Sequence, residues 1–445
     1  MNSAQPRLRR VVRDHPLAPT FVDRPPLSRN KRVPRLPRTL RIILLTQYFP
    51  PEVGATQTRM QSFAEYLASR GHEVTVICEI PNHPHGVIAE DYRGLIYEDD
   101  RSNPYRVLRV WVQASAEKTQ KTRLQFYLSY MTTATAIAPL AGAADIVFAT
   151  SPPLFTAVAG AAIAKLKGAA FVLDVRDLWP AAAVSLKQIS TGRTLKAAEQ
   201  LERWLYRLAD LVTCVTRPFC DHVDNLRHRA PAAVYLPNGT LDQFFTNGDR
   251  DYRSKFGIPA DRYLIVFAGT LGIAQALPAV IEAAGRVDGS AEFAFVGEGP
   301  MKRALVDDVR KRSLKNVHFF PEVPLADVPG VLCASDALLV TLSAHPTFAD
   351  FVPSKLLDCM ASGRPVIVSA TGESARIVDQ AGAGVVVSPE DPAALESGVR
   401  WLIENRAAGR EMGERGRNFA RRFPRRVQAE RLECLLLDVV KTKRT

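Results

Sequence analysis

The chain has 445 residues, of which 47% are hydrophobic and 23% charged; this balance is typical of folded proteins, and the length predicts two or three domains. The formal net charge of +12 is concentrated at the ends, because residues 1–41 carry a net +9 and residues 415–445 a net +7, which leaves −4 between them. That distribution argues against nucleic acid as a partner, since a nucleic-acid-binding protein should carry its basic residues on the folded face that meets the phosphates.

Residues 1–39 hold seven prolines and no hydrophobic periodicity, which predicts a mobile, basic tail. From residue 40 onward, apolar strands alternate with amphipathic helices. The first series spans residues 40–236, with predicted strands at 41–46, 73–78, 145–150, 170–174 and 210–216 and helices at 56–69, 154–166 and 195–209. The last of these helices carries an apolar stripe that predicts core packing, formed by Leu201, Trp204, Leu205 and Leu208.

The segment Pro237-Asn238-Gly239 interrupts the alternation, and we interpret Asn238-Gly239 as a turn after a strand rather than a glycosylation site. The second series spans residues 237–410, with predicted strands at 262–268, 292–296, 316–320, 336–342, 365–369 and 384–387 and helices at 275–286, 300–312, 353–361, 373–380 and 391–404. Residues 411–445 predict a basic C-terminal helix that packs back on the first domain. Two doubly wound α/β domains are the simplest architecture, with ligands at the carboxyl ends of the strands.

Six cysteines are scattered along the chain without C-x-x-C spacing, so we expect reduced thiols and a cytoplasmic protein. The longest run without a charged residue, 146–164, contains Pro152 and Pro153 and predicts a strand, a turn and a helix rather than a membrane span. The basic ends leave two interpretations open: contact with anionic lipid headgroups, and so a peripheral position on the inner membrane, or charges that are simply solvated.

The most informative segment runs from Asp350 to Asp358, with the sequence D-F-V-P-S-K-L-L-D. Pro353 suits a first helical turn, so Asp350 should precede a helix and Asp358 should lie about one turn inside it. The free N–H groups of a helix start and Lys355 would suit a diphosphate, and a carboxylate would suit ribose hydroxyls. On spacing alone, a helix cap at Asp350 and a salt bridge between Lys355 and Asp358 explain the pattern equally well.

This stretch resembles the E-x7-E region of glycosyltransferase family four, in the branch whose motif is P-S-K-x-x-E, with both glutamates replaced by aspartates. Further segments resemble the same branch in the same order, namely Tyr48–Thr56, Pro81–Pro84, Ala149–Pro153, Asp174–Pro180, Phe267–Gln275 and Gly297–Pro300. The resemblance covers almost everything from residue 40 to about residue 435.

The resemblance implies a GT-B fold, in which two Rossmann-like domains face each other across a cleft. It also implies a retaining, metal-independent transfer of a sugar from a UDP- or GDP-sugar, with no separate cofactor. The residues that it places around the donor are Gly54, Gly269, Gly272, Gln275, Glu298, Lys355 and Asp358. The candidate catalytic and acceptor-side residues are His83, Arg176, Asp177, Asp350 and Lys355. The one D-x-D sequence, Asp249-Arg-Asp251, falls in a polar linker and predicts solvated surface instead of a metal site.

The biological setting that the resemblance implies is cell-surface or exopolysaccharide assembly, with a lipid-linked saccharide as acceptor. Residues 117–131 place basic side chains beside aromatic ones and would suit a headgroup layer, although a plain surface helix explains them as well. Within this stretch Leu124, Leu128 and Met131 are expected to face the core. Two other functions remain open: a sugar-nucleotide epimerase on the same fold, and a non-catalytic nucleotide-sugar-binding protein.

Overall fold

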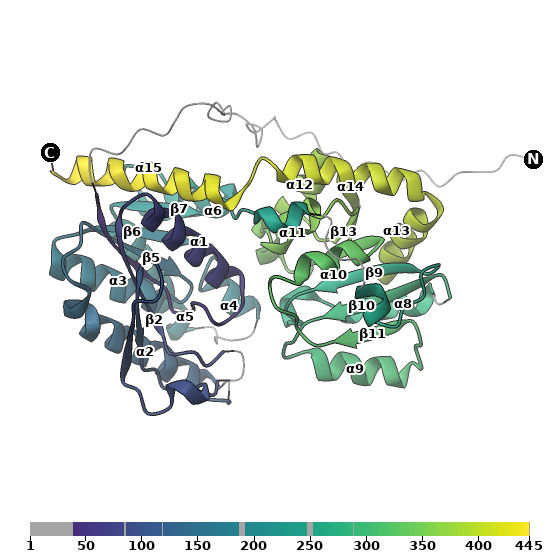
Figure 1. Ribbon diagram of the computed structural model, residues 1–445, viewed down its shortest axis with the longest axis horizontal. Coiled ribbons are helices and arrows are strands. Elements are labelled where there is room, and N and C mark those ends of the chain that lie inside the picture. Colours follow the sequence, from purple (N-terminus) through teal and green to yellow (C-terminus); the bar gives the residue numbers. More distant parts are fainter. Residues whose placement is uncertain are drawn as a thin grey trace, which may run out of the picture. The chain divides into compact units, whose positions relative to one another are not determined.

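The computed structural model describes residues 39–83, 86–117, 119–186, 192–246, 252–287 and 289–444. Within these residues the chain forms two α/β halves, each built around one sheet (Figure 1). The predicted fold class is therefore confirmed: both halves are Rossmann-like. The predicted tail, Lys118 and the D-x-D segment 249–251 lie outside the described residues.

The sheet of the first half has the strand order β3-β4-β2-β1-β5-β6-β7-β8. Its strands are β1 (Arg41–Leu45), β2 (Glu73–Glu79), β3 (Tyr97–Asp100), β4 (Arg106–Val110), β5 (Ile146–Ser151), β6 (Ala170–Val175), β7 (Leu211–Cys214) and β8 (Val234–Tyr235). All neighbours pair in parallel except β3 and β4, which are antiparallel. The helices of this half are α1 (Ala55–Ser69), α2 (Gln120–Ile137), α3 (Leu154–Lys167), α4 (Ala181–Ser185), α5 (Arg193–Leu208) and α6 (Arg217–Arg227).

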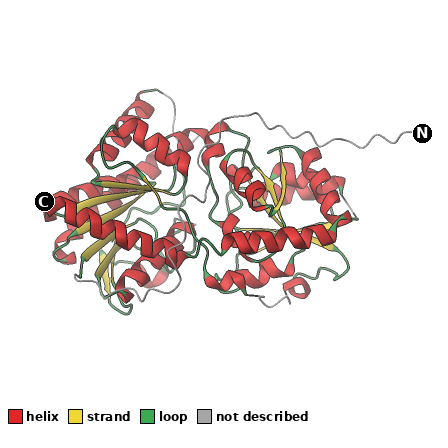
Figure 2. Cartoon of the chain, turned by 90° about the horizontal axis from the view of Figure 1, so that it is seen from above, coloured by secondary structure: helices red, strands yellow, loops and turns green. Residues whose placement is uncertain are grey.

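The sheet of the second half is parallel throughout, in the order β11-β10-β9-β12-β13-β14. Its strands are β9 (Tyr263–Ala268), β10 (Ala291–Val296), β11 (Val317–Phe320), β12 (Ala337–Thr341), β13 (Val366–Ser369) and β14 (Gly384–Val387). The helices are α7 (Tyr252–Lys255), α8 (Pro278–Arg286), α9 (Lys302–Lys311), α10 (Val328–Ala334), α11 (Lys355–Ala361), α12 (Glu373–Ala381), α13 (Pro392–Glu404), α14 (Arg406–Ala420) and α15 (Arg425–Arg444). Figure 2 shows helices on both sides of the strands, which is the arrangement that buries both faces of a parallel sheet.

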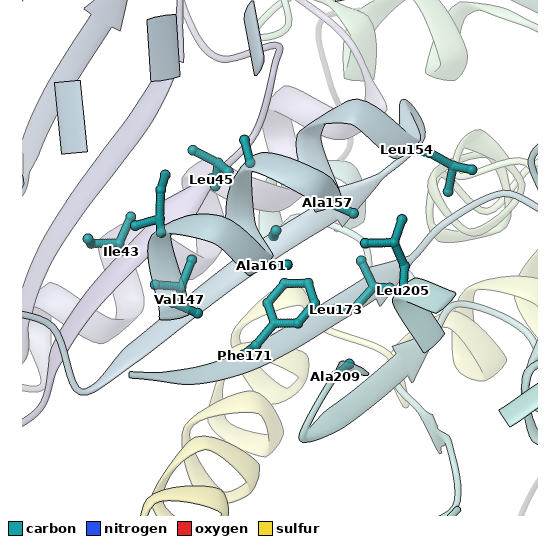
Figure 3. Packing of buried hydrophobic residues seen from close by; sticks show 14 of the residues in the cluster. Ile43, Leu45, Val147, Leu154, Ala157, Ala161, Phe171, Leu173, Leu205 and Ala209 are labelled. Carbon is teal, nitrogen blue, oxygen red and sulfur yellow. The ribbon is translucent and has the colours of Figure 1, made fainter. Parts of the chain in front are cut away.

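Short apolar strands buried on both faces explain why the alternation could be recognised. Every residue of β5 and β6 is buried. The neighbouring helix α3 is rich in alanine and glycine, and a Cβ added at Gly160 would lie 2.5 Å from the Cβ of Ala149. Small side chains therefore let α3 lie directly on the sheet, where Phe171 and Leu173 fill the remaining space (Figure 3).

Several local expectations were wrong. Trp204 and Leu208 are 49% and 42% exposed, so only half of the α5 stripe packs into the core. Leu124 and Leu128 are also exposed, because α2 turns Tyr130 and Ala134 toward the sheet instead. The basic C-terminal segment is two helices, α14 and α15, with Pro424 between them. Asn238-Gly239 is not a turn; it leads into a bridge between Thr240 and Pro424.

Helix α15 belongs to the packing of the first half although it follows the second half in sequence. Its residues Ala429, Leu432, Leu436 and Val440 are buried in one cluster with β1, β2 and α1. Figure 1 shows α15, in yellow, running along α1, in purple. The chain therefore passes between the halves twice, before β9 and before α15.

Candidate active site

The strand orders locate the candidate site. In the first half, the strand order runs in one direction from β1 to β2 and β4 and in the other from β5 to β8, so the direction switches between β1 and β5. In the second half the same switch lies between β9 and β12. Ligands of doubly wound sheets bind outside the carboxyl ends of the strands at such switch points. The predicted site residues follow strand ends at or beside these switch points: Gly54 after β1, Gly269 after β9, Asp350 after β12, and Arg176 and Asp177 after β6, the neighbour of β5.

Two glycine loops at the ends of β9 and β10 lie backbone on backbone. Leu271 N–H donates to the Glu298 carbonyl at 2.8 Å. A Cβ at Gly297 would lie 2.2 Å from the Gly269 carbonyl oxygen, and one at Gly299 would lie 2.4 Å from that of Leu271. Gly269 has φ 130° and Gly297 has φ 145°, conformations that other residues rarely adopt. Glycine is therefore required for this close approach.

The far end of the first loop is attached to β12. The Thr341 hydroxyl donates to the Gln275 carbonyl at 2.6 Å, and Ser343 N–H donates to the Ala274 carbonyl at 2.8 Å. Gly272 has an extended backbone, and a Cβ there would lie 2.6 Å from Gln275 Oε1. The loop is thus fixed at both ends, which suits a surface that must meet a ligand through its backbone.

Lys355, at the start of α11, is the cation that faces this loop. Its Nζ lies 3.2 Å from the centre of the Phe267 ring and donates to the Ala268 carbonyl at 3.4 Å. A Cβ at Gly269 would lie 3.7 Å from this Nζ. Burial lowers the pKa of Lys355 to about 7. Among the described residues Lys355 forms no ion pair with Asp358, so the alternative explanation by a helical salt bridge is wrong.

Asp358 lies one turn further along α11. Its Oδ1 is buried and makes no hydrogen bond within the described part of the chain. Burial raises the pKa of this carboxyl, whereas the Arg425 guanidinium and the Thr240 hydroxyl lower it. Both neighbours come from the two segments where the chain passes between the halves.

Asp350 lies in different surroundings, at the end of the 3-10 helix Pro346–Asp350. Burial raises its pKa, as does Glu373, while His222 on α6 lowers it. The residue that caps α11 is Ser354, without a side-chain hydrogen bond, so Asp350 is not a helix cap. The loop also contacts the first half, because Phe351 meets Phe219 edge to face with ring centres 5.3 Å apart.

Glu298 is committed to another partner. Its carboxylate pairs with Lys302 at 2.5 Å, and its carbonyl already receives the Leu271 N–H. A ligand at this turn would therefore meet backbone rather than a free carboxylate.

In the first half, Arg176 joins the ends of three elements. It donates to the Thr56 hydroxyl on α1 and to the Pro152 carbonyl, the latter at 3.1 Å. Burial lowers the pKa of Arg176 to about 10 and raises that of the neighbouring Asp177 to about 7. Asp177 Oδ1 is buried without a hydrogen bond among the described residues. Gly54 starts α1 beside them with an extended backbone, and a Cβ there would lie 2.5 Å from Gln57 Oε1.

His83 is exposed, and its ring meets Tyr48 edge to face at 5.5 Å. The residue that organises this loop is one that the sequence prediction missed. Glu52 Oε1 accepts the N–H groups of both Asn82 and His83 at 2.7 Å, and burial raises the Glu52 pKa. Its position inside the Tyr48–Thr56 motif, at a strand end, was the signal that could have identified it.

Two protein-family models match this chain. Residues 54–239 match the model of the glycosyl transferase 4-like domain, and residues 248–419 match that of glycosyl transferases group 1. The chain belongs to glycosyltransferase family four. It is 27% identical over 392 residues to the putative colanic acid biosynthesis glycosyl transferase WcaI of Escherichia coli K12, covering 84% of this chain and 96% of that one.

Solved structures give the same fold for this glycosyltransferase. Sucrose-phosphate synthase of Thermosynechococcus elongatus superimposes with a TM-score of 0.70 at 18% identity, covering 90% of this chain and 99% of that one. HepE of Anabaena, in complex with UDP and glucose, gives a TM-score of 0.67 at 16% identity, with 89% and 99% covered. In the described part of the glycosyltransferase no helix is long and apolar enough to cross a membrane, and no group of three His, Cys, Asp or Glu residues could hold a metal ion.

Proposed function

We propose that this glycosyltransferase transfers a sugar from a UDP- or GDP-sugar to a lipid-linked saccharide, with retention of configuration and without a metal or further cofactor. The observation that carries the proposal is the position of the Lys355 ammonium beside the glycine loop at the end of β9. A partly buried cation beside exposed backbone can neutralise the charge that develops on a departing diphosphate. In this arrangement the glycine loop and Lys355 bind the diphosphate and Asp358 binds the ribose.

The donor sugar would lie between Asp350 on the second half and the group of Gly54, Arg176 and Asp177 on the first. Arg176 and Thr56 are hydrogen-bonded to each other and can offer donors to an anion or hydroxyl. Asp177, with a pKa of about 7, can accept a proton or a hydroxyl hydrogen bond near neutral pH. These residues therefore serve the acceptor and the transferred sugar, while His83 flanks them.

The lipid-linked acceptor is supported by the surface of α2. Leu124 is 48% exposed and Leu128 is 36% exposed, one turn apart, on a helix that also carries Lys121 and Arg123. Apolar side chains with basic neighbours suit the headgroup region of an anionic membrane. The relative WcaI is named for colanic acid biosynthesis. We therefore place the enzyme in cell-surface polysaccharide assembly, in the cytoplasm and peripheral on the inner membrane.

The test is a turnover assay with purified full-length protein, UDP-glucose and GDP-mannose as donors, and a polyprenyl-diphosphate-linked sugar as acceptor. The proposal expects release of UDP or GDP that depends on the acceptor, with a new glycosidic bond of the donor's anomeric configuration. Asp358→Ala should abolish release. Acceptor-independent release with an epimerised sugar would instead identify an epimerase. Donor binding without turnover on any acceptor of this class would identify a non-catalytic binder.

A further inference from the structure

One loop of the second half is in direct contact with the first half. Residues 342–354 connect β12 to α11 and include the 3-10 helix Pro346–Asp350. The Phe351 ring of this loop lies 5.3 Å from the ring of Phe219, near the start of α6, edge to face. Phe351 also packs against the buried hydrophobic cluster of the first half, to which Phe219 belongs. An aromatic side chain therefore anchors the loop to the core of the first half.

A hydrogen bond joins the same loop to the first half at a second point. The Ser185 hydroxyl, at the end of α4, donates to the Thr347 hydroxyl oxygen at 2.8 Å. Helix α4 begins only a few residues after Asp177. In the sequence Thr347 precedes Asp350 and Phe351 follows it, so the backbone that carries this carboxylate is held against the first half on both sides.

The loop is also closely packed within its own half. A Cβ at Gly372, which has φ 66°, would lie 2.1 Å from the Ala349 carbonyl oxygen. The Ser374 hydroxyl donates to the Phe351 carbonyl at 2.7 Å, and the Phe348 ring lies 5.4 Å from the Phe351 ring. The loop is therefore fixed on the start of α12 while the Phe351 ring reaches the first half.

We propose that Phe351 and Thr347 are positioning residues, which act through Asp350 by holding its carboxylate in place against the first half. The inference rests on the proposed function, because it takes Asp350 as a ligand of the donor sugar and assigns Arg176 and Asp177 to the same reaction. A sugar that meets groups from both halves reacts only when those groups are correctly spaced, and a misplacement of about 1 Å can lower a rate about 100-fold. The inference adds to that function the side chains that set this spacing.

Nucleotide binding and sugar transfer should respond differently to the loss of these contacts. The proposed nucleotide ligands, which are the glycine loops, Lys355 and Asp358, all lie in the second half. Loss of the Phe351 contact should therefore lower kcat and leave the affinity for UDP or GDP unchanged. A merely structural role would instead lower the melting temperature and leave kcat at the wild-type value.

The experiment uses the full chain and measures kcat with the polyprenyl-diphosphate-linked acceptor and UDP and GDP affinity by calorimetry. Phe351→Leu should lower kcat about 10- to 100-fold while nucleotide affinity stays within about twofold of the wild type. Phe351→Tyr keeps the ring and should retain most of the wild-type kcat. Phe319→Leu is the matched control and should leave kcat unchanged. Phe319 is also partly buried, and its ring lies 5.2 Å from that of the buried Phe295, but both rings belong to the second half.

A double-variant cycle tests the contact between the two rings. Phe219→Leu should lower kcat as Phe351→Leu does. The double variant should be at most about twofold slower than the slower single variant, because the contact is already lost in each of them. Losses that multiply would show that the two rings act independently, and this result would overturn the inference.

The outcomes separate this inference from the proposed function. If the wild type shows no acceptor-dependent transfer, or if Asp350→Ala keeps the wild-type kcat, the proposed function fails at that point and the inference falls with it. If Asp350→Ala loses transfer but Phe351→Leu keeps the wild-type kcat, only the positioning role is overturned. Should Phe351→Leu not fold, Thr347→Val decides, because it removes only the side-chain hydrogen bond to Ser185. A kcat lowered about two- to tenfold at unchanged nucleotide affinity then supports positioning, and a wild-type kcat refutes it.

Discussion

Lys355 offers a prediction in which affinity and stability change in opposite directions. Its ammonium lies over the Phe267 ring, and partial burial lowers its pKa to about 7. A diphosphate placed at the glycine loop would stabilise the charged form, so binding should take up a proton wherever the free enzyme has lost one. Nucleotide affinity should therefore be constant below pH 7 and weaken as the pH rises above it.

The size of the effect follows from the fraction of protonated lysine. With a pKa of about 7, this fraction falls roughly 30-fold between about pH 6 and about pH 8.5, and the UDP affinity should fall by nearly as much. Lys355→Met should weaken binding about 10- to 100-fold at pH 6, the loss expected for a hydrogen-bonded charge pair, and should abolish the alkaline decline. Calorimetric titration of UDP at several pH values measures both.

The stability of the unliganded enzyme should show the opposite sign. Since the lysine pKa is lower in the folded chain than in the unfolded chain, the unfolded chain binds more protons between the two values, and the free energy of unfolding rises with pH there. Below pH 7 the buried charge is a cost. Lys355→Met should therefore melt above the wild type at pH 6, whereas Lys311→Met, at an exposed helical position, should change neither property. A Lys355→Met enzyme with wild-type affinity and the wild-type pH slope would refute the assignment of Lys355 to the phosphates.

Three further predictions concern other parts of the site. Gly299→Ala would place a Cβ 2.4 Å from the Leu271 carbonyl oxygen and should weaken UDP binding at least tenfold by separating the two loops. The control is Gly289→Ala, which is also at positive φ but has nothing within 4 Å of the added Cβ; equal UDP affinities in the two variants would contradict the prediction. Asp177 is ionised above about pH 7, so the wild-type transfer rate should fall as the pH drops through that value. Asp177→Asn should give a low transfer rate that does not change with pH, with unchanged UDP affinity; a wild-type pH dependence in the variant would exclude Asp177 as the proton acceptor. Arg59→Met leaves the Asp174 carboxylate buried without its guanidinium partner and should lower the free energy of unfolding in urea by about 3 to 5 kcal/mol. The double variant Arg59→Met/Asp174→Asn should regain part of that stability; no recovery would show that the loss is one of packing.

The fold could be predicted from the sequence because its central strands are buried on both faces. Runs such as those of β5 and β6 are mostly apolar and buried at every position, and the helices between them have one apolar side. The prediction missed β3, whose sequence Tyr-Glu-Asp-Asp is polar because the strand lies at the edge of the sheet. It also overestimated the core on α2 and α5, since an apolar stripe does not reveal which part of it meets another element.

The site could be predicted only in part, for a physical reason. The glycine loops, Lys355 and Asp358 lie in short motifs at strand ends, and the motifs mark them. The environments that give them their properties come from distant segments: the Arg59–Asp174 pair spans 115 positions, and the Arg425 charge that lowers the pKa of Asp358 lies at the start of α15. Burial and its effect on the pKa of Lys355 and Asp177 likewise depend on the assembled fold.

We propose a nucleoside diphosphate as the ligand of Lys355, Asp358 and the carboxyl end of β9 in the second half. The most direct test is thermal unfolding of the wild type and Asp358→Ala with UDP, GDP or ADP. A ligand at about 100 times its dissociation constant adds about 2.7 kcal/mol, a shift of roughly 5 to 10 °C in a chain with halves of this size. One of the nucleotides should give this shift in the wild type, and none should give it in the variant. Equal shifts in the two proteins, or no shift with any nucleotide, would contradict it.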